Sequence, residues 1–195
     1  MKNKKRTMEQ HDKSFIISCK TGDVAATKSH LQEILPKNLF AVGFRNAIIC
    51  GHVAIVKLLM EHLGNRQSSF FYEQENNWET GFFYDYNPIH LAVEYQQIDM
   101  VQYLLEDTTF GKKQWMDEGN CIRSTPLEVA MRADPINTDI VMLLLQNGAE
   151  YKSTLAMLSH DNTSSWENER IASLEQLIVL EQLIDEMNTA SNIKG

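Results

Sequence analysis

Apolar residues recur along the chain at helical spacing in several short stripes. In two of these stripes each apolar residue has another one three or four positions away: Ile55, Val56, Leu58 and Leu59 in the first, and Met100, Val101, Leu104 and Leu105 in the second. A shorter segment of about two helical turns precedes each stripe and has an alanine, Ala47 or Ala92, near its centre. Because alanine lets a neighbouring helix approach closely, the pattern predicts an all-α fold of stacked helical pairs.

The ends of these segments carry residues that begin or end helices. Pro88 and Pro126 stand where a first helical turn would start, and a backbone N–H has no intrahelical acceptor there. Gly51 and Gly148 suit turns that need a positive φ. The local preferences therefore agree with the stacked pairs.

The same order of segments occurs four times, in copies that begin near Phe15, Phe44, Asn87 and Thr125. The third copy reads Asn-Pro-Ile-His-Leu-Ala-Val, and the fourth reads Thr-Pro-Leu-Glu-Val-Ala-Met. These segments resemble ankyrin repeats, whose pattern contains Thr-Pro-Leu-His-x-Ala, a Gly-His turn, Ile-Val-x-Leu-Leu and a Gly-Ala exit. The first copy departs from this pattern, since Ala26 and Thr27 stand in place of Ile-Val.

The resemblance implies an ankyrin-repeat solenoid of four to five helical-hairpin repeats over residues 13–150. We expect repeats near 13–40, 41–63, 87–106 and 124–150, with long insertions at 64–86 and 107–123. The insertions follow from the spacing of the copies, because Ala92 lies 45 positions after Ala47, whereas the family repeat is about 33 residues long. A smaller insertion at Asp134–Ile136 lengthens the turn inside the fourth repeat.

The two ends of the chain differ from the repeats. We expect residues 1–12 to be a flexible basic segment, 151–188 to be a degenerate repeat or a capping helix, and 189–195 to be a flexible tail. Residues 166–188 have a broad apolar face made of Ile171, Leu174, Leu177, Ile178, Leu180, Leu183, Ile184 and Met187. This helix either caps the last repeat or forms a dimer or partner seam through Leu177, Leu180, Ile184 and Met187.

Composition and charge narrow the possible partners. The chain has 195 residues and a formal net charge of -8, which disfavours nucleic acid and anionic membrane surfaces as partners. No window of about 18 residues is continuously apolar, so no membrane insertion is expected. Cys19, Cys50 and Cys121 have no metal-ligand spacing and fit free thiols in a reducing compartment, which predicts a cytoplasmic location.

Catalytic and cofactor motifs are absent from the sequence. It has no phosphate-binding glycine loop, no zinc-binding helix with two histidines and no nucleophile elbow, so we expect no cofactor, no metal and no enzymatic activity. By the resemblance, His90 and His52 are structural histidines of the repeat. An enzyme whose active site is built from the insertions remains an alternative.

The first insertion is rich in aromatic residues. It holds Phe70, Phe71, Tyr72, Trp78, Phe82, Phe83, Tyr84 and Tyr86. Aromatic side chains concentrate at the centres of protein interfaces, so this loop is a candidate binding finger. The alternative is that it folds back as a local core between repeats, and the sequence leaves both open. Trp115, beside Lys112 and Lys113, marks the second insertion as a more basic finger.

The resemblance also implies binding positions on the first helix of each repeat. By that match the candidates are Arg45, Ile49, Glu94, Tyr95, Glu128 and Arg132. The predicted function is a non-enzymatic adaptor that holds an unidentified protein partner through its concave face and aromatic loop, as a monomer or as a weak dimer through the C-terminal helix.

A second hypothesis concerns delivery into another cell. The chain is similar to short ankyrin proteins that intracellular bacteria inject into host cells, given its Lys-rich start and a C-terminal segment dotted with glutamates. This hypothesis predicts an effector that binds and redirects a host protein in the host-cell cytoplasm.

Overall fold

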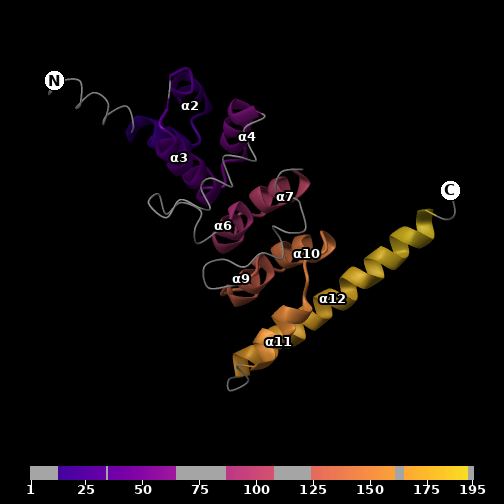
Figure 1. Cartoon of the computed structure of the whole chain (residues 1–195). Helices are drawn as coiled ribbons and strands as arrows, with labels where there is room; N and C mark the ends of the chain where they lie inside the picture. The colour runs from indigo at the N-terminus through magenta and orange to yellow at the C-terminus, as the bar shows by residue number, and fades with distance from the viewer. Residues whose placement is uncertain (1–12, 34, 65–86, 108–123, 161–164, 193–195) are drawn as a thin grey trace.

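The computed structural model describes residues 13–33, 35–64, 87–107, 124–160 and 165–192. Within these ranges all regular structure is helical, as the sequence predicts. After a helix at residues 13–21, the order is α2 (Val24–His30), α3 (Lys37–Ile49), α4 (Val53–Leu63), α6 (Pro88–Glu94), α7 (Ile98–Glu106), α9 (Pro126–Arg132), α10 (Thr138–Gln146), α11 (Lys152–His160) and α12 (Ser165–Asn192) (Figure 1).

The helices form pairs that stack into two layers. Within a pair, α3 packs on α4, α6 on α7, and α9 on α10. The first helices of successive pairs also contact one another, with α6 between α3 and α9, and we call them the inner layer. The second helices contact one another in the order α4, α7, α10, and we call them the outer layer. This is the predicted solenoid, and Figure 1 shows its pairs following one another down the stack.

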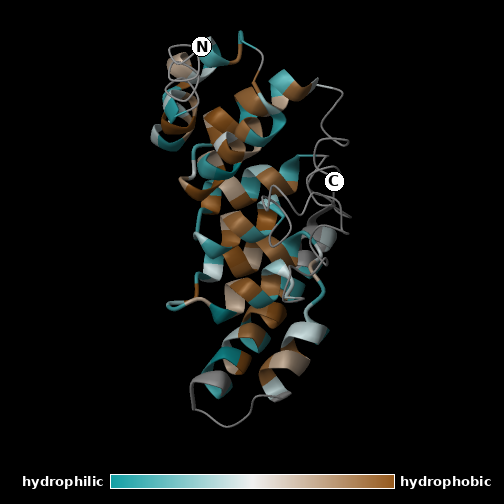
Figure 2. Ribbon diagram, turned by 60° about the vertical axis from the view of Figure 1, so that its left-hand side comes forward, coloured by the Kyte–Doolittle hydropathy of each residue, from teal (hydrophilic) through white to brown (hydrophobic). Residues whose placement is uncertain are grey.

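One apolar core runs through the stack between the two layers. Figure 2 shows the hydrophobic residues concentrated along its middle. The alanines predicted to allow close helix approach, Ala47 and Ala92, are buried at 0% exposure, and Ala130 at the matching position of α9 is 4% exposed. A larger side chain at these positions would push neighbouring inner helices apart, because a packed core has no spare volume.

The predicted helix starts are present. Pro88 begins α6 and Pro126 begins α9. The Asn87 carboxamide oxygen caps α6 by accepting from the backbone N–H of His90 at 3.0 Å. Local sequence therefore determines where these inner helices begin.

The turns inside the first three pairs share one backbone feature, a residue with a positive φ. Gly22, Gly51 and Gln96 follow the first helices of three pairs and have φ values of +75°, +72° and +53°. The positive φ predicted for Gly51 is confirmed, as is that of Gly148 at +83°. Gln96 takes the same conformation without being glycine, which strains its backbone.

A similar hydrogen bond ties the turns of the second and third pairs to the turn of the pair before. His52, which follows Gly51, places its Nε2 2.9 Å from the backbone oxygen of Lys20. Gln97, which follows Gln96, donates from Nε2 to the backbone oxygen of Ile49 at 3.1 Å. The structural role predicted for His52 is therefore confirmed. At the next turn the pattern changes, and Gln96 donates to Pro135 at 3.5 Å instead.

His90 links α6 to the segment that leads into α9. Its side chain is completely buried, and its Nε2 lies 2.8 Å from the backbone oxygen of Ser124. Burial lowers the pKa of this imidazole to about 4, although the bond to Ser124 acts in the opposite direction. The ring is therefore neutral at pH 7 and structural, as the sequence predicts.

The degenerate first pair replaces an apolar contact with a polar one. Thr27 is fully buried, and its hydroxyl donates to Ser18 Oγ at 3.0 Å. Ser18 in turn donates to the backbone oxygen of Phe15 at 2.8 Å. Because both hydroxyls have acceptors, Thr27 occupies the core at the position where the family pattern has a branched apolar residue.

The C-terminal helix covers the last pairs of the stack. α12 packs on α10 and α11, with Leu174 at 0% and Ile178 at 7% exposure. The guanidinium of Arg170 donates to the backbone oxygens of Met131 and Ala133, which fastens α12 to the end of α9. The capping role is therefore present in the first half of this helix.

Two of the expected boundaries differ from the helix limits. α3 begins at Lys37, so the expected limit between residues 40 and 41 falls inside a helix. α12 continues to Asn192, and residues 189–192 of the expected flexible tail are helical. The helix continues because Thr189–Asn192 contains neither proline nor glycine, and each added residue gains one backbone hydrogen bond.

Candidate protein-binding surface

Three residues occupy the same position on successive inner helices. Ile49, Glu94 and Arg132 each follow the buried alanine of their helix by two residues. Lys20 holds the matching place in the first pair, two residues before Gly22, as Ile49 stands before Gly51. Ile49 is half-buried and the other three are exposed. We call this set the inner row.

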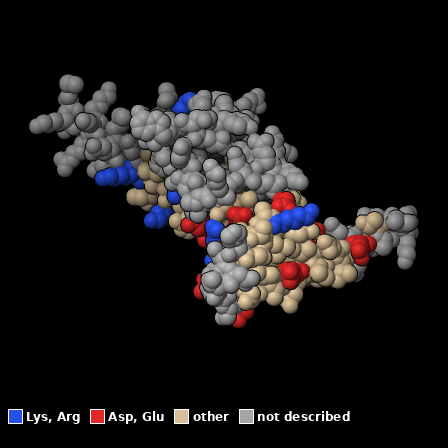
Figure 3. Space-filling view, turned by 60° about the horizontal axis from the view of Figure 1, so that its bottom comes forward, with Lys and Arg blue, Asp and Glu red and all other residues tan. Residues whose placement is uncertain are grey.

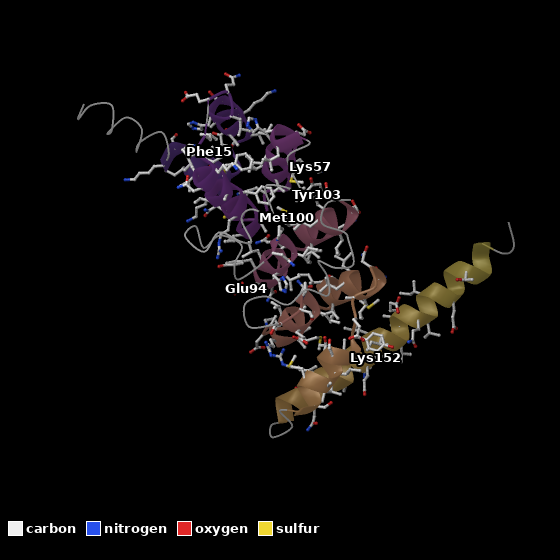
Figure 4. All side chains as sticks on the ribbon, in the orientation of Figure 1. Phe15, Lys57, Glu94, Met100, Tyr103 and Lys152 are labelled. Atoms are coloured by element: carbon white, nitrogen blue, oxygen red, sulfur yellow. The ribbon has the colours of Figure 1, made fainter. Side chains whose placement is uncertain are left out.

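The inner row lies on the face opposite the outer layer. In Figure 4, Glu94 lies on the side of α6, whereas Lys57 and Tyr103 lie on the side of α4 and α7. Lys57 places its Nζ 5.1 Å from the centre of the Tyr103 ring, which adds one cation–π contact between α4 and α7. Charge changes sign along the inner row, from Lys20 through Glu94 to Arg132.

Two further candidates adjoin the row. Tyr95 caps the C-terminal end of α6 and is 44% exposed, which leaves a large aromatic surface beside Glu94. Arg45 is half-buried on α3, one turn before Ile49. The candidates Arg45, Ile49, Glu94, Tyr95 and Arg132 therefore all lie on the inner helices or at their ends, and their part in binding stays a prediction.

Glu128 is a correction to the predicted binding set. It is only 8% exposed, and its carboxylate accepts from the backbone N–H of Thr125 at 3.2 Å. Thr125 accepts in return from the backbone N–H of Glu128 at 3.3 Å, which completes a capping box at the start of α9. Glu128 therefore stabilises the helix start and presents no free carboxylate. The Thr-x-x-Glu spacing already carried this signal.

A pocket of about 680 Å³ lies at the C-terminal end of the inner row. It is lined by Arg132, Asp134, Pro135, Ile136, Glu169, Arg170 and Ser173, so we call it the row-end pocket. The turn after α9 forms one wall and the first half of α12 forms the other. Arg132 belongs to both the row and the pocket, and one of its guanidinium nitrogens donates to Ser124 Oγ at 2.6 Å.

The sequence does not predict this pocket. The insertion at Asp134–Ile136 can be recognised in it, but the position of α12 beside that insertion cannot. Two hydrogen bonds bring them together, because Arg170 on α12 reaches the backbone oxygens that precede the insertion. Residues so far apart in sequence give no local signal of this approach.

The aromatic candidates lie outside the described residues. This set comprises Phe71, Tyr72, Trp78, Phe82, Phe83, Tyr84, Tyr86 and Trp115. Whether the first insertion is a binding finger or a local core therefore stays a prediction.

Two observations concern metal-binding and thiol groups in the described residues. In them, histidine, cysteine and acidic side chains form no group of three or more that would hold a metal ion. Cys19 is buried, and burial raises the pKa of its thiol to about 11, which keeps it protonated and unreactive at neutral pH. Of the helices that the structure describes, none is long and apolar enough to span a membrane.

Comparison with known proteins identifies the repeats. Residues 44–154, more than half of the chain, match the family model described as ankyrin repeats (3 copies). The chain belongs to the ankyrin-repeat family. Ankyrin repeats generally act as protein–protein interaction modules, and their fold is typically a binding scaffold without enzymatic activity.

Other comparisons add less. No curated protein matches the chain. Among solved structures, the crystal structure of the human ASB11 ankyrin repeat domain is similar, with 23% sequence identity and a TM-score of 0.39. The match covers 86% of this chain and 81% of that domain. Membership of the ankyrin-repeat family rests on the sequence match.

Proposed function

We propose that this ankyrin-repeat chain is an adaptor that binds another protein along the inner row and takes one partner side chain into the row-end pocket. The observation that supports this most directly is the position of Arg132, which stands at the end of the row and in the wall of the pocket. A partner segment that follows the row therefore reaches the pocket without changing direction.

The physical basis of this proposed binding is that the inner row is already rigid before a partner arrives. Inner helices held by a continuous core and by hydrogen bonds between turns keep the row in one geometry, which lowers the entropic cost of association. Tyr95 supplies the exposed aromatic residue that interface centres favour. The alternating charges of Lys20, Glu94 and Arg132 select a partner segment whose charges alternate in the opposite order.

The test begins with affinity capture of partners by the full chain, followed by binding measurements on the purified pair. We expect Tyr95→Ala to weaken binding by about 30-fold, since loss of an interface aromatic costs about 2 kcal/mol. Glu94→Lys should also weaken binding, because it removes the sign change in the row. Glu106→Lys, the same substitution on the exposed side of α7, is the matched control and should leave affinity unchanged.

A second comparison separates the row from the aromatic insertion. Trp78, Phe83 and Tyr84 are replaced together by alanine in the same binding assay. If this variant loses the partner while Tyr95→Ala and Glu94→Lys keep it, the binding site is the insertion and the inner-row proposal is wrong.

A further inference from the structure

The helix α12 has apolar residues on two opposite sides. One side is packed against the stack through Leu174 and Ile178. The other side exposes large apolar side chains, namely Val179 at 56%, Leu180 at 47% and Leu183 at 51%. Each residue advances the helix by about 100°, so Leu183, nine residues after Leu174, lies on the opposite side of the helix axis. We call Val179, Leu180 and Leu183 the outer strip.

The outer strip does not complete the core of the repeats. In Figure 1 the C-terminal half of α12 extends past α10 and away from the stacked pairs. Leu177 and Ile184, two residues of the predicted seam, are half-buried, whereas Leu180 is exposed. The side chain of Met187 is outside the described residues. The strip is thus an apolar surface on a helix that the first half of α12 already anchors.

The charge around the strip is acidic. Glu175 and Glu186 are exposed and lie on the same side of the helix as Val179, one turn before it and two turns after it. The single basic residue of Ser165–Asn192 is Arg170, and its guanidinium is bonded to backbone oxygens of the α9 end. Figure 3 shows that this end of the molecule is mostly uncharged, with scattered acidic side chains and a basic side chain among them.

The acidic residues beside the outer strip distinguish between two possible binding partners, a second copy of the chain and a basic helix of another protein. A second copy of the chain would bring an acidic row beside another acidic row, on a protein with a net charge of -8, and like charges across an interface oppose association. A helix with an apolar stripe bordered by lysine and arginine would cover Val179, Leu180 and Leu183 and pair with Glu175 and Glu186. We propose that the outer strip docks such a basic amphipathic helix of another protein. This proposal does not rest on the inner-row function.

The experiment measures binding of a synthetic peptide to the full chain by fluorescence anisotropy. The probe is a helix of about three heptads with leucine at the apolar positions and lysine beside them. A second probe keeps the leucines and replaces every lysine with glutamate. We expect the lysine probe to bind and the glutamate probe to bind at least about tenfold more weakly.

Variants of the strip locate the site. Leu180→Ser combined with Leu183→Ser, and separately Glu175→Lys combined with Glu186→Lys, should each reduce affinity for the lysine probe by about tenfold or more. Glu61→Lys combined with Glu106→Lys makes the same charge change on the exposed side of the outer layer and should have a small effect. Circular dichroism checks that each variant remains helical, which we expect because all the replaced side chains are exposed.

Three results would overturn the proposal. Equal losses in the Glu61/Glu106 control would mean general attraction to an acidic protein. Equal binding of both probes would mean that charge does not select the partner. A concentration-dependent dimer in sedimentation velocity that disappears in the Leu180→Ser, Leu183→Ser variant would mean that the strip binds a second copy, as the sequence analysis allowed.

Discussion

Gly51 stands where two neighbouring turns lie close together. Its φ is +72°, and an added Cβ would lie 2.2 Å from Oε1 of Gln97. The Gln97 side chain can rotate away, but then Nε2 leaves the backbone oxygen of Ile49, to which it donates at 3.1 Å. Gly51→Ala therefore strains the backbone and also breaks a bond between turns.

The expected magnitude follows from these two effects. A residue with a Cβ in the left-handed region costs about 1–2 kcal/mol, and loss of the hydrogen bond costs about 1 kcal/mol. Alanine also restricts the unfolded chain, which offsets about 0.4–1 kcal/mol. We expect the free energy of unfolding to fall by about 2 kcal/mol. Gly148→Ala is the control, because Gly148 has a φ of +83° and nothing within 4 Å of an added Cβ, so its loss should be about 1 kcal/mol.

Urea unfolding followed by circular dichroism measures both losses. A double-mutant cycle with Gln97→Ala isolates the contact, because removing that side chain removes both the clash and the bond. In the Gln97→Ala background, Gly51→Ala should cost no more than Gly148→Ala does. The reasoning is refuted if the two glycine variants lose equal stability in the native background.

Two further predictions concern the α6–α7 pair. Gln96→Gly should raise the thermal midpoint by relieving the strain at φ +53°, since the bond from Gln96 to Pro135 is long and exposed; an unchanged or lower midpoint contradicts this. In the folded chain His90 has a pKa of about 4, below its ordinary 6.5. Its contribution to the free energy of unfolding is therefore complete above pH 6.5 and is lost as the pH falls from 6.5 toward 4. Between pH 7 and 5 the chain should lose about 2 kcal/mol that a His90→Gln variant does not lose, as urea midpoints at both pH values would show; equal losses would assign the pH dependence to other groups.

Much of the fold could be predicted because it depends on local signals. Pro88 and Pro126 begin the helices where the sequence places them, and Ala47 and Ala92 are buried where close packing needs a small residue. The turn at Gln96 could not be identified from its residue type, because glutamine gives no sign of a positive φ. There the stacking of neighbouring pairs overrides the local preference.

The candidate site was less predictable. Glu94 and Tyr95 are exposed as expected, but Glu128 is held in a capping box that its spacing from Thr125 already indicated. The row-end pocket depends on Arg170 reaching the end of α9 from a distant helix. The amphipathic pattern of α12 indicated one broad apolar face, whereas the structure packs one side of it and exposes another.

Several expectations drawn from the sequence stay predictions. The part played by the aromatic insertion concerns residues outside the described ranges. The cytoplasmic location, delivery into a host cell and the oligomeric state are properties that repeat geometry does not determine, because the same stack serves unrelated purposes.

If a partner enters the row-end pocket, as proposed, the turn at residues 133–137 is a place where binding preference can change during evolution without loss of the fold. Asp134 and Pro135 are exposed, so a residue gained or lost there leaves the buried helices intact. The same residues form a wall of the row-end pocket, and a longer or shorter turn would remodel that cavity. Exchanging this short segment between related proteins should therefore transfer partner choice without loss of folding.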